Sequence, residues 1–596
     1  MFPRRYLYLA ALTVASLARS GPAFAEETRP VATLAHIKLH GDLDEAPVAS
    51  DPLFGTAAEN FKSKLDRIKK AKGDGAVHGL YLQVDSLAIG WGKLDELRKA
   101  IADFRSAGKK AYAYLESGEG KDYLLATACD EICVPESGWL MLTGLRAEIS
   151  FYKDLFDKLG VKADMLQMGD FKGAAEPYTR SGMSPEFRKQ FESVLDDYYE
   201  KSLVGVIAKS RPKLSAEQVK KLIDNGPYTA KGALAAGLVD RVAYADAFET
   251  GLKTALHAER VRVTKNYGQA KAEELDFSNP FALLKMLAPP KATSSKSPKI
   301  AVIYATGVIV TGKSGMSLLG GESCGSTTMI EAIRQAEQDK TVKAIVLRVD
   351  SPGGSALASD LIWNELAKSK KPVIASMGDT AASGGYYISM AARKIYAEPG
   401  TLTGSIGVVG GKIALGGAFD KLGLKTEVIS RGANANILSI NSPFSDGERK
   451  AMTALMRNVY DQFLDKTLQG RKKAGKTLER VDLEKLAGGR IWTGRQAKAN
   501  GLVDELGTLN DAVAAAWEAA GMSKDAEAEW LVLPKAKNFL DTILEMKSGS
   551  DASSALAGRL LRDLPEISGK LGSLEAILRL RGEPVWAVLP CRVEMR

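Results

Sequence analysis

The sequence predicts an α/β fold in which two tandem copies of one domain each carry a mixed, largely parallel sheet with flanking helices. The first observation is an internal repeat, because short motifs return at an almost constant offset of about 264 residues. The matched stretches are 82–86 with 347–351, 157–160 with 420–423, 228–231 with 492–495 and 236–240 with 500–504. The second observation is that strand-like apolar runs alternate with helical patterns, which is typical of a sheet with helices packed on its faces.

Length and composition agree with a multidomain globular protein. The chain has 596 residues, 45% of them hydrophobic and 26% charged, which excludes a disordered, collagenous or disulfide-scaffold protein. The formal charge of +9 is a weak bias over this length and does not predict nucleic-acid binding. Only four histidines are present, and the cysteines lack the paired spacing of a metal site, so no metal or organic cofactor is expected.

The first 25 residues have the three parts of a secretory signal peptide. Arg4 and Arg5 precede an apolar run over residues 6–18, and residues 23–25 form an Ala-x-Ala cleavage site. Because that run is shorter than the about 17–25 residues of a membrane-spanning helix, we expect export, with an uncleaved anchor as the alternative. The protein is therefore expected in the periplasm or on the periplasmic side of the inner membrane.

Pattern and composition divide the chain into five segments. These are the signal peptide over 1–25, a first repeat over 26–285, a Pro/Ser-rich linker over 286–299, a second repeat over 300–530 and a helical extension over 531–596. In the second repeat, strand-like runs cover 300–304, 344–349 and 373–376, with helical patterns over 361–368 and 447–471.

The four cysteines are expected to be buried thiols. Cys129 and Cys133 lie four residues apart at a strand-like stretch over 131–134, and side chains at that spacing on a strand are too far apart for a disulfide. A bridge between Cys324 and Cys591 is left open.

Ser383 is the candidate nucleophile of the second repeat. It follows a strand-like run, lies among small residues, and precedes a helical pattern that begins directly after it. Unpaired backbone N–H groups and the helix dipole at such a position are suited to stabilising an oxyanion. The first repeat has Glu119 at the matching position. The alternative interpretation is a simple helix cap.

Lys172, in the first repeat, is the candidate general base. With so few histidines a Ser-His-Asp triad is unsupported, whereas a buried lysine with a lowered pKa can deprotonate a serine. Lys172 lies among small and apolar residues, and the second repeat has Ala435 at the matching position. One repeat thus carries a candidate serine and the other a candidate lysine, which favours a shared site over a solvated surface lysine.

Two glycine-rich segments of the second repeat complete the candidate site. Gly353 and Gly354 follow a strand and precede a helix, where their backbone N–H groups are suited to an oxyanion hole; a tight turn is the alternative. Ser405 lies in a second glycine-rich run over 400–411 and supplies a hydroxyl.

These segments resemble the signal peptide peptidase A family in its long tandem-domain form, also called protease IV. The resemblance rests on residues 349–354, 376–386, 401–407 and 492–504, and on 172–177 in the first repeat. It implies Clp/crotonase-like domains and a serine endopeptidase with a Ser/Lys dyad. Such an enzyme hydrolyses apolar peptides, in particular cleaved signal peptides, through an acyl-enzyme and without a cofactor.

The resemblance also implies roles for individual residues. Ser383 is then the nucleophile, Lys172 the general base, Ser405 the hydroxyl that orients the lysine amine, and Gly353, Gly354 and Gly384 the oxyanion hole. A homo-tetramer in contact with a membrane surface is implied as well. The chain departs from the long forms in its N-terminal segment, which looks cleavable where they carry a membrane anchor. Two alternatives remain, a non-catalytic peptide-binding scaffold and a crotonase-like acyl-CoA enzyme.

Overall fold

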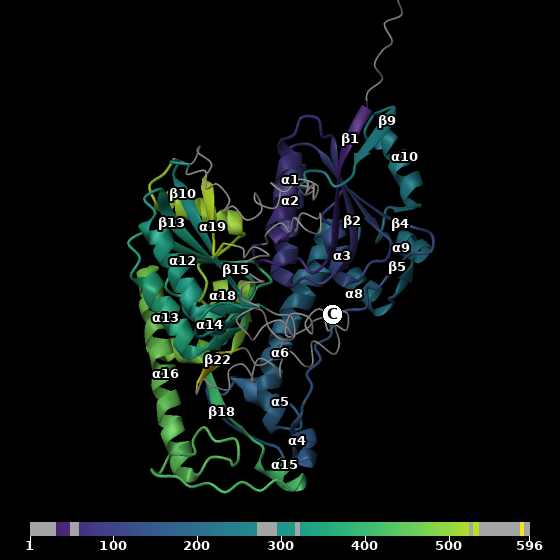
Figure 1. Ribbon diagram of the computed structural model, residues 1–596. Helices are drawn as coiled ribbons and strands as arrows, with labels where there is room; N and C mark the ends of the chain where they lie inside the picture. The colour runs from purple at the N-terminus through teal and green to yellow at the C-terminus, as the bar shows by residue number, and fades with distance from the viewer. Residues whose placement is uncertain are drawn as a thin grey trace, which may run out of the picture.

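The computed structural model describes residues 31–47, 59–270, 295–315, 322–523, 528–535 and 585–588. Within these ranges the two repeats form two α/β units, drawn from purple to blue and from teal to green in Figure 1. The fold class predicted from the repeat and the strand–helix alternation is confirmed. The predicted signal peptide lies outside the described residues, as do most of the linker and most of the extension. None of the helices in the described ranges combines the length and apolar character needed to cross a membrane.

The first unit is built on a parallel sheet of six strands in the order β8-β4-β3-β2-β1-β9. The strands are β1 (Val31–Gly41), β2 (Gly79–Leu87), β3 (Lys110–Leu115), β4 (Glu131–Val134), β8 (Arg241–Val242) and β9 (Arg260–Thr264). Leu80, Tyr81 and Leu82 are all buried although they alternate between faces, because helices cover both sides of the sheet. The helices are α1 (Phe61–Gly73), α2 (Trp91–Arg105), α3 (Gly120–Ala126), α7 (Gly205–Ser210), α8 (Ala216–Asp224), α9 (Ala230–Ala235) and α10 (Ala245–Ala255), and β5 (Trp139–Leu140) pairs with β7 (Tyr228–Thr229).

The second unit repeats this plan with an eight-stranded sheet whose main order is β19-β17-β15-β13-β10-β21. Its strands are β10 (Lys299–Thr306), β13 (Val342–Ser351), β15 (Val373–Ala382), β16 (Lys394–Ala397), β17 (Leu402–Gly404), β19 (Ile491–Thr493), β20 (Glu505–Leu506) and β21 (Glu529–Leu533). The helices are α12 (Ser326–Gln338), α13 (Ala356–Ala367), α14 (Gly384–Ser389), α16 (Asp446–Lys473), α17 (Arg480–Leu486), α18 (Gly494–Ala499) and α19 (Leu509–Ala519). The strands predicted over 300–304, 344–349 and 373–376 and the helix over 447–471 are confirmed. The long helix α16 begins at a capping box formed by Ser445 and Glu448, which satisfies its first backbone N–H groups.

A third sheet joins the two units, in the order β12-β11-β14-β22-β18-β6. Strand β6 (Lys162–Met168) comes from the first repeat, yet it pairs antiparallel with β18 (Val408–Ala414) of the second along its whole length. The other strands are β11 (Val308–Val310), β12 (Ser323–Gly325), β14 (Gly353–Ser355) and β22 (Trp586–Val588). After β6 the first repeat continues through a 3-10 turn (Gly173–Ala175), α5 (Glu176–Thr179) and α6 (Pro185–Asp197), which leads into a π-helical stretch (Tyr198–Val204). An arm of the first repeat is thereby built into the second.

The described part of the C-terminal extension is strand, where the sequence predicted helix. Strand β21 crosses the predicted boundary at residue 530 and pairs parallel with β10, so it belongs to the sheet of the second unit. Its sequence, Glu529–Leu533, is rich in aromatic and branched side chains that favour a strand against an open sheet edge. Strand β22 likewise joins the third sheet. The amphipathic stretch noted in the rest of the extension lies outside the described residues.

The cysteines of the described residues are free thiols. Cys133 and Cys324 are buried as expected, whereas Cys129 is only partly buried. Burial raises the pKa of the Cys133 and Cys324 thiols to about 12, which keeps them protonated at neutral pH. Cys591 lies outside the described residues.

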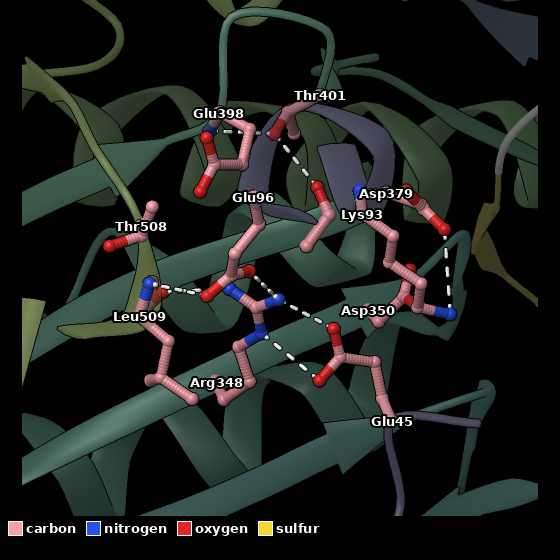
Figure 2. Close-up of polar contacts among 12 residues, drawn as sticks. Glu45, Lys93, Glu96, Arg348, Asp350, Asp379, Glu398, Thr401, Thr508 and Leu509 are labelled. Atoms are coloured by element: carbon pink, nitrogen blue, oxygen red, sulfur yellow. Dashed lines mark hydrogen bonds and ion pairs between the residues drawn. The ribbon is translucent and has the colours of Figure 1, made fainter. Parts of the chain in front are cut away.

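A buried charge cluster holds the two units together (Figure 2). Arg348 of β13 is fully buried, and its guanidinium donates to the carboxylates of Glu45 and Glu96 from the first unit, with 2.8 Å to Glu96. Glu96 also accepts a hydrogen bond from the backbone N–H of Leu509, at 3.1 Å. Buried charges need such complete pairing, so the cluster fixes one relative position of the two units.

A second contact docks helix α2 of the first unit on the end of strand β15. Asp379 of β15 accepts hydrogen bonds from the backbone N–H groups of Gly90 and Lys93, and so caps the start of α2. The Lys93 amine lies 3.3 Å from Asp350 and 3.4 Å from Asp379. Although burial disfavours its charge, these carboxylates raise the pKa of Lys93. The strand that precedes Ser383 is therefore anchored to the first unit.

Candidate active site

Ser383 lies at the sharp turn between strand β15 and helix α14. Its backbone has φ 55° and ψ −112°, a positive-φ conformation that a residue with a side chain rarely adopts. The Ser383 backbone N–H donates to the carbonyl oxygen of Gly404 at 2.8 Å, which holds the turn. The helix predicted to begin after Ser383 is confirmed. Among the described contacts the Ser383 side chain makes no capping hydrogen bond to α14, so the helix-cap interpretation does not hold.

Lys172 reaches Ser383 from the arm of the first repeat. It follows strand β6, and its Nζ lies 2.7 Å from Ser383 Oγ. The same nitrogen lies 2.9 Å from the carbonyl oxygen of Ser405 and 2.9 Å from Ser405 Oγ. All three residues are completely buried. The structure thus brings together the serine and the lysine that the sequence places in different repeats, with Ser405 beside them.

Burial determines the charge of the Lys172 amine. Desolvation lowers the pKa of Lys172 well below the ordinary lysine range. A neutral amine has two N–H groups and one lone pair. The two N–H groups can donate to the carbonyl and hydroxyl oxygens of Ser405, which leaves the lone pair facing the Ser383 hydroxyl. A neutral amine at this distance from a serine hydroxyl can accept its proton.

A loop at residues 488–490 packs on Lys172 and was not identified from the sequence. Gly489 has φ 86°, and a Cβ at this position would lie 2.4 Å from the backbone N and Cα of Lys172. The next residue, Arg490, accepts a hydrogen bond from the Ser405 backbone N–H at 2.7 Å. This loop therefore positions Lys172 and Ser405 together. Its sequence signal is the pair of adjacent glycines just before the repeated motif at 492–504.

The predicted oxyanion glycines lie beside Ser383 but differ in their contacts. A Cβ on Gly353 would lie 2.6 Å from the backbone N of Gly384, so these two backbones approach closely. The Gly353 N–H donates to Ser351 Oγ at 3.1 Å, and Gly354 pairs with Ile309 of β11. Since the Gly353 amide already has an acceptor, the Gly384 amide is the stronger candidate donor for an oxyanion.

Comparison with known proteins places this site in a family. The model of "Peptidase family S49" matches residues 103–259 and 365–523, once in each repeat, and the model of "Clp protease" matches residues 321–401. The chain is 34% identical to "Serine protease SPPA, chloroplastic" of Arabidopsis thaliana, over 86% of this chain and 74% of that protein. It is also 34% identical to "Protease 4" of Salmonella typhi, over 79% of this chain and 75% of that protein. The chain therefore belongs to peptidase family S49, with two Clp-like α/β domains in tandem.

Proposed function

We propose that this protein is a serine endopeptidase in which Ser383 attacks the peptide carbonyl and Lys172 acts as general base. The observation that carries the proposal is the 2.7 Å separation of Lys172 Nζ and Ser383 Oγ in a site whose burial lowers the lysine pKa. A protonated lysine could not accept the serine proton, so desolvation is what makes this pair reactive. Ser405 is a positioning residue, since its two oxygens hold the amine in line with Ser383.

The proposed reaction has two stages. In the first, Lys172 takes the Ser383 proton while Oγ bonds to the substrate carbonyl carbon, and the Gly384 amide donates to the oxyanion. Lys172 then gives that proton to the leaving amine as the C–N bond breaks, which leaves an acyl-enzyme on Ser383. In the second stage Lys172 takes a proton from a water molecule as the water oxygen bonds to the acyl carbon. The ester C–O bond then breaks, and Lys172 returns the proton to Ser383 Oγ, which restores the dyad.

The proposed substrates are hydrophobic peptides, in particular cleaved signal peptides. The apolar surroundings of the dyad support this, because Ala174 and Ala175 closely follow Lys172 and form a buried cluster with Val409, Trp586 and Met165. The name of one relative, "Putative signal peptide peptidase SppA" of Enterococcus faecium, agrees with such substrates. The signal-peptide pattern in residues 1–25 supports a place in the periplasm or on the periplasmic side of the inner membrane.

We further propose that four copies associate and that the assembly contacts a membrane surface. Helix α4 (Lys153–Leu159) lies beside α15 (Gly416–Lys421) at one end of the molecule (Figure 1), where a Cβ on Gly160 would lie 2.6 Å from Gly417. These helices and the chain after α15 expose large apolar side chains, which are Leu155, Leu159, Leu422, Leu424, Val428, Ile429, Leu438 and Ile440. A monomer in water rarely exposes so much apolar surface in one region, and a subunit interface would cover it.

Turnover of a small apolar fluorogenic peptide at about pH 8 tests the proposed function. The parent, lacking residues 1–25, is compared with Ser383→Ala and Lys172→Ala, and circular dichroism checks that each is folded. We expect both variants to lose turnover while staying folded. A Lys172→Ala variant that keeps its rate would show that the base is elsewhere, and a parent that cuts no peptide would favour a binding protein.

A further inference from the structure

Helix α6 of the first repeat packs against both residues that flank Lys172. Figure 1 shows α6 in blue beside the second unit, where it packs on strand β19. Its residues Phe187 and Gln190 are three apart and share one face of the helix, and both are buried. A Cβ on Gly173 would lie 2.0 Å from the Phe187 ring, so this ring lies on the backbone that follows Lys172. Gln190 meets the backbone that precedes it, at Phe171.

The side-chain amide of Gln190 joins the Lys172 segment to the start of strand β19. Its Nε2 donates to the Phe171 carbonyl oxygen at 2.9 Å, and its Oε1 accepts from the Ile491 backbone N–H at 3.2 Å. Because one partner is an acceptor and the other a donor, an amide in this orientation satisfies both. The Phe171 carbonyl oxygen also accepts from the Gly173 N–H at 2.8 Å, so the turn that carries Lys172 is held from α6.

Two further contacts join the same two segments. The Phe171 N–H donates to the Gly488 carbonyl oxygen at 2.9 Å, and the Arg490 guanidinium lies 3.8 Å from the centre of the Phe171 ring. The Arg490 carbonyl in turn accepts from the N–H of Ser405, whose two oxygens lie 2.9 Å from Lys172 Nζ. The lysine is therefore held both at its main chain and at its amine.

We propose that Gln190 is a positioning residue, which holds the Lys172 amine against the Ser383 hydroxyl by fixing the main chain beside Lys172. This inference rests on the proposed function. Gln190 takes no proton in the reaction and acts through Phe171 and Ile491. Its effect is to keep Lys172 Nζ 2.7 Å from Ser383 Oγ and away from water.

A looser turn at Lys172 would change both the position and the hydration of its amine. A displacement of about 1 Å in a reacting group lowers the rate by about 100-fold. Water that reached the amine would raise its pKa towards the ordinary lysine range, because desolvation is what lowers it. Loss of Gln190 should therefore alter the pH dependence of the reaction as well as its rate.

The charged groups around Lys172 leave desolvation as the cause of its lowered pKa. On the segments packed against it, Asp170 is exposed and the Arg490 guanidinium lies over an aromatic ring. The Glu176 carboxylate accepts two hydrogen bonds from Ser184. The charged residues in the turns of α6 that pack here are all exposed, and these are Glu186, Arg188, Lys189 and Glu192. The pH dependence of turnover should therefore report the hydration of the amine.

The pH dependence of kcat on an apolar fluorogenic peptide tests the assignment. Gln190→Met has a similar length and shape but lacks the amide. We expect kcat to fall by about tenfold to 100-fold at neutral pH with little change in KM. The acid limb of the profile should move to higher pH, so that the loss is smaller at high pH. A variant that is only less folded would give a lower rate with the acid limb of the parent.

Gln496→Met is the matched control. Gln496 also joins α6 to the second unit, because its Nε2 donates to the Ser193 carbonyl oxygen and its Oε1 accepts from the Thr493 N–H. Neither of these partners adjoins Lys172 in the chain. We expect this variant to keep both the kcat and the acid limb of the parent.

A second variant, Gln190→Glu, keeps the side-chain shape and the acceptor for Ile491, but its carboxylate has no hydrogen to donate to Phe171. We expect its acid limb to move in the same direction as that of Gln190→Met. Gln190 is not a positioning residue if both variants keep the acid limb of the parent, if Gln496→Met shifts it equally, or if circular dichroism shows that neither variant folds; the proposed function then stands. A parent that cuts no peptide, or a Ser383→Ala variant that cuts it equally well, would show that the proposed function itself fails.

Discussion

Replacing Gly489 by alanine tests whether close backbone packing holds Lys172 in line with Ser383. The new Cβ would lie 2.4 Å from Lys172 N and Cα, whereas ordinary contact begins at 3.4 Å. The two backbones must therefore separate by about 1 Å, and neither is a side chain that could turn aside. A displacement of that size in a group that takes part in the reaction lowers the rate by about 100-fold.

The matched control for this variant is Gly501→Ala. Gly501 has φ 84°, against 86° for Gly489, but a Cβ at Gly501 meets no atom within 4 Å. Backbone strain should cost each variant about 1–2 kcal/mol of stability, measured by urea unfolding. Gly489→Ala should lose more than this because of its overlap with the Lys172 backbone. Only Gly489→Ala should also lose kcat on an apolar fluorogenic peptide. If both folded variants turn over the peptide equally, the packing of Gly489 does not position the lysine and the reasoning is refuted.

Three further predictions follow from the buried groups and one from the exposed apolar surface. The pKa of Lys172 is lower in the folded chain than in the unfolded one, so the folded state binds fewer protons and the free energy of unfolding rises with pH up to the ordinary lysine range. Lys172→Met should therefore raise the free energy of unfolding at neutral pH. A series of urea titrations should show that this gain vanishes at high pH. Peptide turnover by the parent should fall as the pH is lowered and Lys172 becomes protonated, and a rate that is flat from about pH 5 to 9 would count against this base. Arg348→Ala should lose about 3–5 kcal/mol of stability, because Glu45 and Glu96 stay buried without their partner. Arg334 forms an exposed ion pair, so the control variant Arg334→Ala should change the stability little. Equal losses of stability in the two variants would contradict the role of the cluster. Ile429→Asp should lower the mass measured by light scattering below that of the tetramer, and an unchanged tetramer would place the interface elsewhere.

Ser383 and Lys172 could be identified from the sequence because the two repeats can be aligned with each other. Ser383 has Glu119 as its counterpart at the start of the matching helix, and Lys172 has Ala435. Two copies of one domain that differ in complementary ways at two positions point to one shared site. The strands β10, β13 and β15 could also be predicted from the sequence, because short apolar runs flanked by turns are typical of the buried strands of a parallel sheet.

The remaining parts of the site depend on contacts between segments far apart in the sequence, which local sequence patterns do not predict. The pairing of strand β6 with the second unit was not predicted, because the sequence of a strand does not specify which strand it pairs with. Strand β22 is three residues long, too short to show a period of two, and its place depends on the open edges of β14 and β18. The packing of Gly489 on Lys172 likewise joins segments more than 300 residues apart in the sequence.

The division of the proposed dyad between the two units has a consequence for when the enzyme could first act. Lys172 precedes Ser383 by 211 residues, and the loop at 488–490 that contacts Lys172 and Ser405 is made later still. Until that loop is in place the lysine amine is hydrated and therefore charged, and it cannot accept a proton. On the proposed mechanism an emerging chain would therefore be inert, and proteolysis would begin only once residues up to 490 have been made and the two units have come together. Such timing would keep this proteolytic activity out of the compartment in which the chain is made.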